Sequence, residues 1–237
     1  MRLFCFPYAG GLASIYHTWP QFLPENVELY AAQLPGRGSR TKEPSFTNIQ
    51  PLVEAIVPAI RPHLDKPFAF FGHSMGALIS FELAHKLRQQ YDIEPVHLFI
   101  SGCRPPQFRI IDNDAYKLPD PEFIEELRRL NGTPKEVLEH AELMELIIPI
   151  LRADFEICQT YASTPKSQLS CPMTIFGGLQ DIDVSRQYLE GWGEYTTAPS
   201  SLRMLPGDHF FLHSAERTLL QQVYIGLQQV SARLKGS

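Results

Sequence analysis

A serine, an aspartate and a histidine that are far apart in the chain could together activate a hydroxyl group for attack on a carbonyl carbon. Ser74 is the centre of a Gly-His-Ser-Met-Gly pentapeptide that follows the apolar run Phe68–Phe71. A G-x-S-x-G pattern between a strand and a helix is typical of a nucleophile elbow, a strained turn that exposes the serine hydroxyl at the top of a sheet. We therefore predict that a strand ends at Phe71, that a helix spans Met75–Gln90, and that Ser74 is the nucleophile.

A serine hydroxyl is a weak nucleophile at neutral pH and needs a histidine base, which is itself oriented by a carboxylate. On sheets with a nucleophile elbow, these groups follow in the order serine, acid, histidine. His209 follows the apolar run Leu202–Leu205 and a Pro-Gly turn, and it precedes a helical pattern, so we predict it as the base. Asp181 follows the run Met173–Phe176 and a Gly-Gly pair, so we predict it as the acid, with Asp183 as the alternative.

Attack on a carbonyl also requires two backbone N–H groups that stabilise the negative charge developing on its oxygen. In a nucleophile elbow, one of them belongs to the residue after the serine, which here is Met75. The second should come from the loop after the run Leu3–Phe6, where paired glycines allow close approach of the backbone. We predict Ala9 as this second donor, with Tyr8 as the alternative.

Short apolar runs alternate with helical patterns along most of the chain, which favours a mostly parallel sheet with helices on both faces. The predicted strands are Leu3–Phe6, Val27–Gln33, Phe68–Phe71, Val96–Ser101, Met173–Phe176 and Leu202–Leu205. The predicted helices that flank this sheet are Ile49–His63, Met75–Gln90, Ser185–Tyr195 and Ala215–Leu234. We expect a single α/β domain over residues 1–237.

One long segment, from about Asn113 to Thr164, shows helical patterns and no strand pattern. Its predicted helices are Pro121–Leu130, Pro134–His140 and Glu142–Tyr161. Ligands of parallel α/β sheets bind at the carboxyl edge of the strands. The position of the segment between two core strands therefore predicts an inserted helical lid over that edge, about residues 113–164. The alternative is that these helices belong to the core.

Composition excludes several classes of partner. The net charge of -5 leaves no basic surface for nucleic acid, and no apolar run reaches the roughly 20 residues that span a bilayer. The chain enters a strand pattern at once, without room for a secretory signal. The four cysteines are scattered without metal-site or disulfide spacing. We expect a cytoplasmic monomer with no metal, no nucleic acid partner and no membrane partner.

Several stretches resemble the type II (external) thioesterases of polyketide and nonribosomal peptide assembly lines, which belong to the α/β hydrolase superfamily. The elbow is one of them, and the others are Phe6–Gly11, Leu34–Arg37, Leu98–Gly102, Leu130–Pro134, Leu151–Phe155 and Gly207–Leu212. The resemblance covers nearly the whole chain. Two departures are Asp208, where the family commonly has glycine, and Ile182, where proline often follows the acid.

The resemblance implies hydrolysis of acyl thioesters from the phosphopantetheine arm of carrier protein domains, which would free stalled synthases. It implies no cofactor of the enzyme's own. The same pattern includes the medium-chain thioesterases of fatty acid synthesis, and the predicted triad alone also suits a general carboxylesterase or lipase. A non-catalytic binding protein on this fold is a further alternative. We interpret Arg37 as a turn residue that makes a surface or interdomain ion pair, in preference to a substrate contact.

Overall fold

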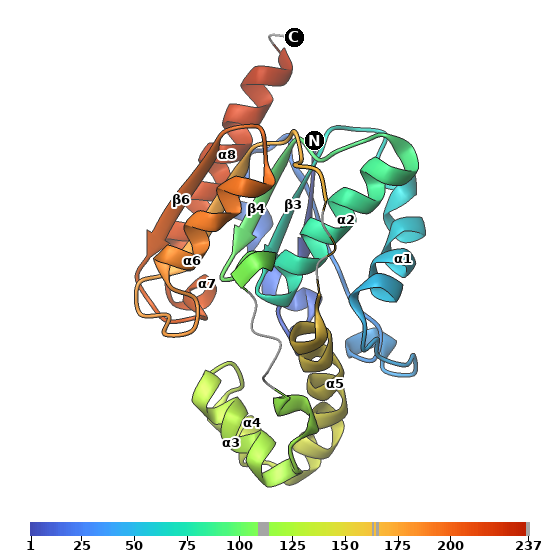
Figure 1. Ribbon diagram of the computed structural model, residues 1–237, viewed down its shortest axis with the longest axis vertical. Coiled ribbons are helices and arrows are strands. Elements are labelled where there is room, and N and C mark those ends of the chain that lie inside the picture. The colour runs from blue at the N-terminus through green and yellow to red at the C-terminus, as the bar shows by residue number, and fades with distance from the viewer. Residues whose placement is uncertain (109–113, 163, 165, 236–237) are drawn as a thin grey trace.

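The computed structural model describes residues 1–108, 114–162, 164 and 166–235. Its centre is a six-stranded sheet in the order β2-β1-β3-β4-β5-β6, in which each neighbouring pair is parallel (Figure 1). The strands are β1 (Arg2–Phe6), β2 (Glu28–Ala31), β3 (Phe68–His73), β4 (His97–Ser101), β5 (Met173–Gly178) and β6 (Ser200–Leu205). The predicted parallel α/β architecture is confirmed.

The four inner strands β1, β3, β4 and β5 are buried along their whole length. Strands buried on both faces carry continuous apolar runs, which explains the sequence pattern that predicted them. The edge strands β2 and β6 are partly exposed. The register places Gly72 of β3 beside both Phe6 of β1 and Ile100 of β4. The carboxyl ends of these strands therefore meet at one edge, where the loops after them approach one another.

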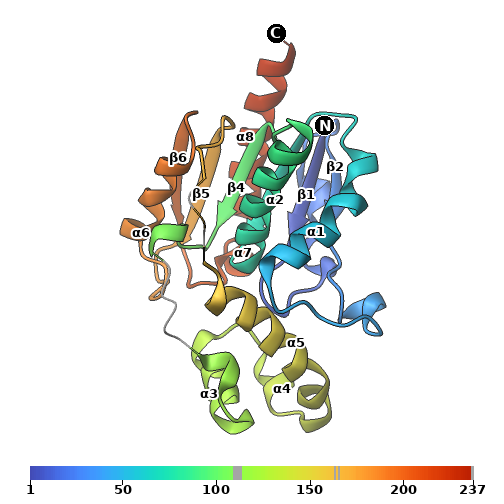
Figure 2. The same cartoon turned by 45° about the vertical axis from the view of Figure 1, so that its right-hand side comes forward.

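Helices cover both faces of this sheet (Figure 2). One face carries α1 (Ile49–Ile60), α2 (Met75–Tyr91) and α6 (Arg186–Glu190), and the other carries α8 (Glu216–Lys235), which follows the short α7 (Phe211–Ser214). Short 3-10 helices are η1 (Ala13–Tyr16), η2 (Trp19–Phe22), η3 (Gly38–Arg40), η4 (Arg61–His63), η5 (Pro106–Phe108), η6 (Ala115–Lys117) and η7 (Gly191–Tyr195). Each face has its own buried apolar layer, with Trp192 in one and Trp19 in the other.

Among the described residues, three α-helices lie between β4 and β5 and extend beyond the carboxyl edge of the sheet (Figures 1 and 2). They are α3 (Asp120–Leu130), α4 (Lys135–Leu138) and α5 (Ala141–Thr160). They share a small apolar cluster of their own that includes Phe123, Leu127 and Leu151. The carboxyl end of α5 instead joins the main core through Ile157. The predicted start of the insertion, Asn113, lies outside the described residues.

Differences from the predicted boundaries have local causes. The predicted helix over Ile49–His63 ends as an α-helix at Ile60 and continues as η4, because Pro62 cannot donate a backbone hydrogen bond. The predicted helix over Ser185–Tyr195 likewise divides into α6 and the 3-10 helix η7, with Gly191 at the junction. These shifts do not change the sheet edge that positions the site.

Candidate active site

The turn between β3 and α2 holds Ser74 in a strained backbone conformation. Its φ and ψ are 54° and −112°, a combination that residues with a side chain rarely adopt. A Cβ atom on Gly72 would lie 2.0 Å from the Gly76 carbonyl oxygen, and one on Gly76 would lie 2.0 Å from the Phe6 carbonyl oxygen. The Ser74 N–H donates to the Ser101 carbonyl oxygen at 2.8 Å. Close backbone contacts thus require both glycines of the motif and hold Ser74 at the carboxyl edge.

The loops after β5 and β6 bring Asp181 and His209 together. The Nδ1–H of His209 donates to Asp181 Oδ2 at 2.7 Å. Asp181 Oδ1 accepts the backbone N–H groups of Asp183 at 3.0 Å and Val184 at 2.9 Å. Burial raises the pKa of Asp181, but the hydrogen bond and charge of His209 and these two donors outweigh it, so the net pKa is lowered. Asp181 is therefore an ionised carboxylate that fixes one ring nitrogen of His209.

Backbone contacts between these two loops explain why the pair forms. The Gln180 N–H donates to the Gly207 carbonyl oxygen at 2.9 Å, and the Gly207 N–H donates to Gln180 Oε1 at 2.6 Å. A Cβ atom on Gly178 would lie 2.2 Å from the Asp208 carbonyl oxygen. Gly178 of the Gly-Gly pair and Gly207 of the Pro-Gly pair are thus residues through which the two loops pack.

The other two carboxylates near His209 have different partners. Asp183, the alternative acid, has Oδ2 at 3.3 Å from Arg129 Nη1. It lies at the surface, and the N-cap position of α6 is occupied by Ser185. Asp208 accepts the Phe210 N–H at 2.8 Å through one carboxylate oxygen. Neither carboxylate contacts the His209 ring within the described residues.

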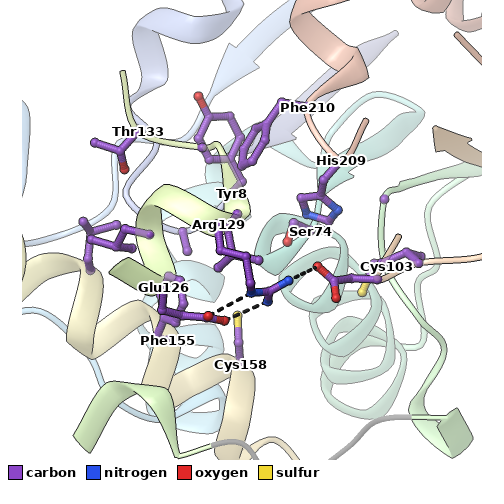
Figure 3. A pocket seen from close by; sticks show the side chains of 18 of the residues that line it. Tyr8, Ser74, Cys103, Glu126, Arg129, Thr133, Phe155, Cys158, His209 and Phe210 are labelled. Carbon is purple, nitrogen blue, oxygen red and sulfur yellow. Dashed lines mark hydrogen bonds and ion pairs between the residues drawn. The ribbon is translucent and has the colours of Figure 1, made fainter. Parts of the chain in front are cut away.

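Ser74 and His209 line the same cavity, which has a volume of about 290 Å³ (Figure 3). One side of it, which we call the floor, consists of the loops after β1, β3, β4, β5 and β6. The opposite side consists of α3, the segment that follows it and α5; together with α4, which packs against these helices, we call it the roof. The roof contributes four apolar residues to the lining: Leu127, Leu130, Leu151 and Phe155. The roof also contributes Glu126 and Arg129, so the cavity offers an apolar surface beside charged groups, opposite a serine and a histidine.

The loop after β1 contains the two predicted candidates for the second oxyanion donor, and both line the cavity. The N–H of Gly10 donates to Asp154 Oδ2 at 2.7 Å, and the N–H of Gly11 donates to the Tyr8 carbonyl oxygen at 2.9 Å. Within the described part of the chain, the N–H groups of Tyr8 and Ala9 have no protein acceptor. Met75 begins α2, so its N–H lies at the positive end of that helix.

Arg37 makes a buried ion pair rather than the surface or interdomain one expected from the sequence. Its Nη1 and Nη2 lie 2.5 Å and 2.7 Å from the two carboxylate oxygens of Asp154 on α5. The two side chains are only 3% and 2% exposed. Sequence reasoning missed the role of Asp154, because 117 residues separate the partners. The only signal was that each lies in a stretch that resembles the same family.

Two further histidines border the site. His73 is fully buried, its Nδ1 lies 2.8 Å from Ser101 Oγ, and burial keeps its pKa well below the usual value. His213, on α7, lies with Nε2 2.9 Å from the hydroxyl of Tyr8, and burial lowers its pKa. Both side chains therefore support the floor and are neutral at pH 7.

A strained serine at a strand–helix turn, beside a histidine–aspartate pair on a parallel sheet, defines a serine hydrolase with the α/β hydrolase fold. In the described residues, no helix has the length and apolar character needed to cross a bilayer. The same residues contain no group of three or more His, Cys, Asp or Glu that could hold a metal ion. The thioesterase domain family matches residues 1–224. The chain belongs to the thioesterase family.

Three relatives refine this assignment. The gramicidin S biosynthesis protein GrsT of Aneurinibacillus migulanus is 48% identical over 221 residues, which are 93% of this chain and 86% of GrsT. The human medium-chain S-acyl fatty acid synthase thioesterase is 36% identical over 241 residues, 98% of this chain and 88% of the human protein. The structure of the type II thioesterase BorB from the borrelidin biosynthetic cluster is 32% identical, with a TM-score of 0.86 over 94% of this chain and 90% of BorB.

Proposed function

We propose that this protein hydrolyses acyl thioesters on the phosphopantetheine arm of carrier protein domains and so removes stalled or aberrant acyl groups from a polyketide or nonribosomal peptide synthase. The observation that carries the proposal is a single cavity, in a thioesterase-family chain, that joins Ser74 to the His209–Asp181 pair beneath a roof with four large apolar side chains. The roof is the lid of this proposal, and its apolar side chains would shelter the acyl chain.

In the proposed mechanism, Ser74 Oγ attacks the thioester carbonyl carbon while His209 Nε2 takes the hydroxyl proton. Asp181 keeps the other ring proton on Nδ1 and stabilises the imidazolium. The N–H groups of Met75 and Ala9 bind the oxyanion of the tetrahedral intermediate. Its collapse breaks the carbon–sulfur bond, and the pantetheine thiol leaves with the proton from His209. Water then attacks the acyl-enzyme with the same base, which releases a carboxylic acid and restores Ser74.

Two alternatives are enzymes with other substrates. Similarity to GrsT exceeds similarity to the human medium-chain thioesterase, 48% against 36% identity, which favours a synthase of the gramicidin type over fatty acid synthesis. A general carboxylesterase would accept simple esters as readily as thioesters. The binding-protein alternative would not need a complete histidine–aspartate pair beside a half-buried serine that lines the cavity.

The partner we propose is an acyl or peptidyl carrier protein domain that presents its arm to the cavity, with the enzyme itself a monomer. We place the reaction in the cytoplasm, in agreement with Cys5 and Cys171, which are buried free thiols. Phosphopantetheine belongs to the substrate in this proposal, and the enzyme needs no cofactor of its own.

The test is turnover of one carrier protein loaded with acetyl, medium-chain or aminoacyl groups, next to matched simple esters. We expect thioester hydrolysis that Ser74→Ala abolishes, while the exposed control Ser39→Ala keeps the wild-type rate. Fluorophosphonate should label the wild type and not Ser74→Ala. Wild-type turnover by Ser74→Ala would overturn the mechanism, and faster hydrolysis of simple esters than of the carrier thioester would favour the carboxylesterase alternative.

A further inference from the structure

Gly10, next to the proposed oxyanion donor, is contacted by the roof helix α5 in two ways. Its N–H donates to Asp154 Oδ2 at 2.7 Å. A Cβ atom on Gly10 would lie 2.6 Å from Leu151 Cδ2, and φ at Gly10 is +77°. Leu151 and Asp154 are three residues apart on α5 and so share one face of that helix. The position of the loop after β1 is therefore set by α5 as well as by the sheet.

Asp154 is itself held rigidly by Arg37. The guanidinium reaches both carboxylate oxygens, at 2.5 Å and 2.7 Å, and neither side chain is more than 3% exposed. Asp154 Oδ2 thus accepts from Arg37 and from the Gly10 N–H at once. Paired, charge-assisted hydrogen bonds of this kind fix geometry as well as charge. Three segments that are distant in the sequence converge on one carboxylate.

A buried ion pair is a poor way to stabilise a fold, because apolar side chains of similar volume do at least as well. We explain its presence here by the position that it gives to the loop after β1. Asp154 engages the N–H of Gly10 and the Tyr8 carbonyl engages the N–H of Gly11, so the loop is held on the carboxyl side of Ala9. These contacts hold the backbone that carries the Ala9 N–H in place. Oxyanion donors stabilise charge through such preorganisation.

We propose that Arg37 and Asp154 are positioning residues that hold the Ala9 N–H in place for the oxyanion, so that α5 of the roof completes the active site in addition to covering it. This inference rests on the proposed thioesterase function. Leu151, on the same face of α5, lines the cavity and packs on Gly10. An acyl group in the cavity thus contacts the helix that holds the donor loop.

The test is a double variant, Arg37→Met with Asp154→Leu, which replaces the ion pair by apolar side chains. Because such replacements are often neutral or stabilising, we expect the variant to fold, with a thermal midpoint that falls by only a few degrees owing to the unpaired Gly10 N–H. It has lost the acceptor for the Gly10 N–H, so kcat on the carrier thioester should fall about 100-fold, the size of effect seen when one oxyanion donor is lost. KM should change less than about threefold, because ground-state binding is retained.

A second readout separates positioning from a structural role. A trifluoromethyl ketone analogue of the acyl-pantetheine substrate forms an oxyanion with the serine, so its affinity should fall by the same factor as kcat/KM. An amide analogue that cannot be attacked should bind within about threefold of its wild-type affinity. Equal losses for both analogues would show general damage to the cavity and would overturn the proposal.

Asp154→Asn and Glu156→Gln complete the design. The asparagine carbonyl can still accept from Gly10, so we expect its kcat to lie between those of the wild type and the double variant, about tenfold down. Glu156→Gln removes a neighbouring carboxylate of α5 and should retain the wild-type kcat.

If the double variant does not fold, equal kcat values for these two single variants overturn the proposal. Activity that survives Ser74→Ala would instead refute the proposed function, whereas an inactive Ser74→Ala beside a fully active double variant refutes only the positioning role.

Discussion

The floor and the roof of the cavity are held in place by different physical means. In the floor, backbones approach so closely that a Cβ atom at Gly72, Gly76 or Gly178 would clash with a carbonyl oxygen at 2.0 to 2.2 Å. The roof has a small apolar cluster of its own and leaves large side chains such as Leu146, 69% exposed, in solvent. The floor can therefore keep its geometry while α3 and α4 shift and α5 keeps its contact with Gly10, since segments with few buried contacts open first.

Polar contacts join the roof to the floor at several points. Arg129 of α3 pairs with Asp183 at 3.3 Å, and the Asn131 amide, at the end of α3, donates to Asp208 at 3.0 Å. The departure from the family pattern at Asp208 thus provides a contact between the two regions. The contrast teaches that the floor, together with the contact that α5 makes at Gly10, determines the reaction, whereas α3 and the rest of the roof determine which substrate is held and for how long.

The largest effect is expected from Asp181→Asn in the floor. The amide cannot hold His209 in the required tautomer, so kcat should fall about 10⁴-fold while the fold is retained. Steady-state kinetics on a carrier thioester measures this directly. The matched control is Asp183→Asn, which changes the same loop but removes a contact to the roof, and its kcat should stay within about fivefold of the wild type. A larger loss for Asp183→Asn than for Asp181→Asn would exchange their assigned roles.

Gly76→Ala should break the floor by a different route. The added methyl group meets the carbonyl of Phe6, which is backbone of β1 and cannot move aside. We expect a loss of about 4 kcal/mol or more in the free energy of unfolding, measured by chemical denaturation. Gly193→Ala is the control, because the nearest atom to its new Cβ is the Ser200 hydroxyl oxygen at 3.3 Å. Similar losses for both variants would show that close backbone contact at the elbow is not the cause.

The contrast also explains what could be predicted from the sequence. Ser74, Asp181 and His209 could be predicted as a site because each follows a strand and a glycine of a tight turn, a pattern that is visible in the sequence. No such pattern indicates the Arg37–Asp154 pair or the Arg129–Asp183 contact, because each joins two segments whose separation in the sequence is not fixed. The ends of α1 and α6 differ from the predicted ends because of single residues, Pro62 and Gly191. A periodic pattern of apolar residues does not resolve such local effects.

Acid should destabilise the sheet through His97. Burial, with a smaller contribution from the charge of Arg233, lowers the pKa of His97 to about 4, and its Nε2 lies 2.9 Å from Thr174 Oγ1. The unfolded chain binds this proton near pH 6.5. Between pH 6.5 and 4 the unfolded state therefore holds more protons, so stability is fully present above this window and is lost as pH falls through it. The loss approaches about 3 kcal/mol for this one group.

The two tryptophans, Trp19 and Trp192, lie in the apolar layers of the sheet, so their fluorescence follows unfolding of this region. Denaturation at pH 7.5 and pH 4.5 should show a smaller difference for His97→Gln than for the wild type. His17→Gln, at an exposed position, should keep the wild-type difference. An unchanged difference in His97→Gln would place the acid sensitivity elsewhere.

The smallest effect is expected where roof and floor meet, at Arg129. Arg129 pairs with Glu126 on its own helix (Figure 3). It also pairs with Asp183 across the cavity. Because its side chain is 43% exposed, Arg129→Gln should change the free energy of unfolding by less than about 1 kcal/mol.

Its functional effect should appear in KM and not in kcat, since the floor is untouched. We expect a change of about two- to fivefold in KM for the carrier thioester, which diminishes at 0.5 M salt because screening weakens the wild-type contact too. Arg128→Gln is the matched control, because Arg128 pairs only with Glu125 of the same helix among the described residues. If both variants shift KM equally, the charge of α3 matters and the Asp183 contact does not. If Arg129→Gln lowers kcat with KM unchanged, α3 acts on the chemical step through this contact, and the separate roles that we assign to the floor and to α3 are wrong here.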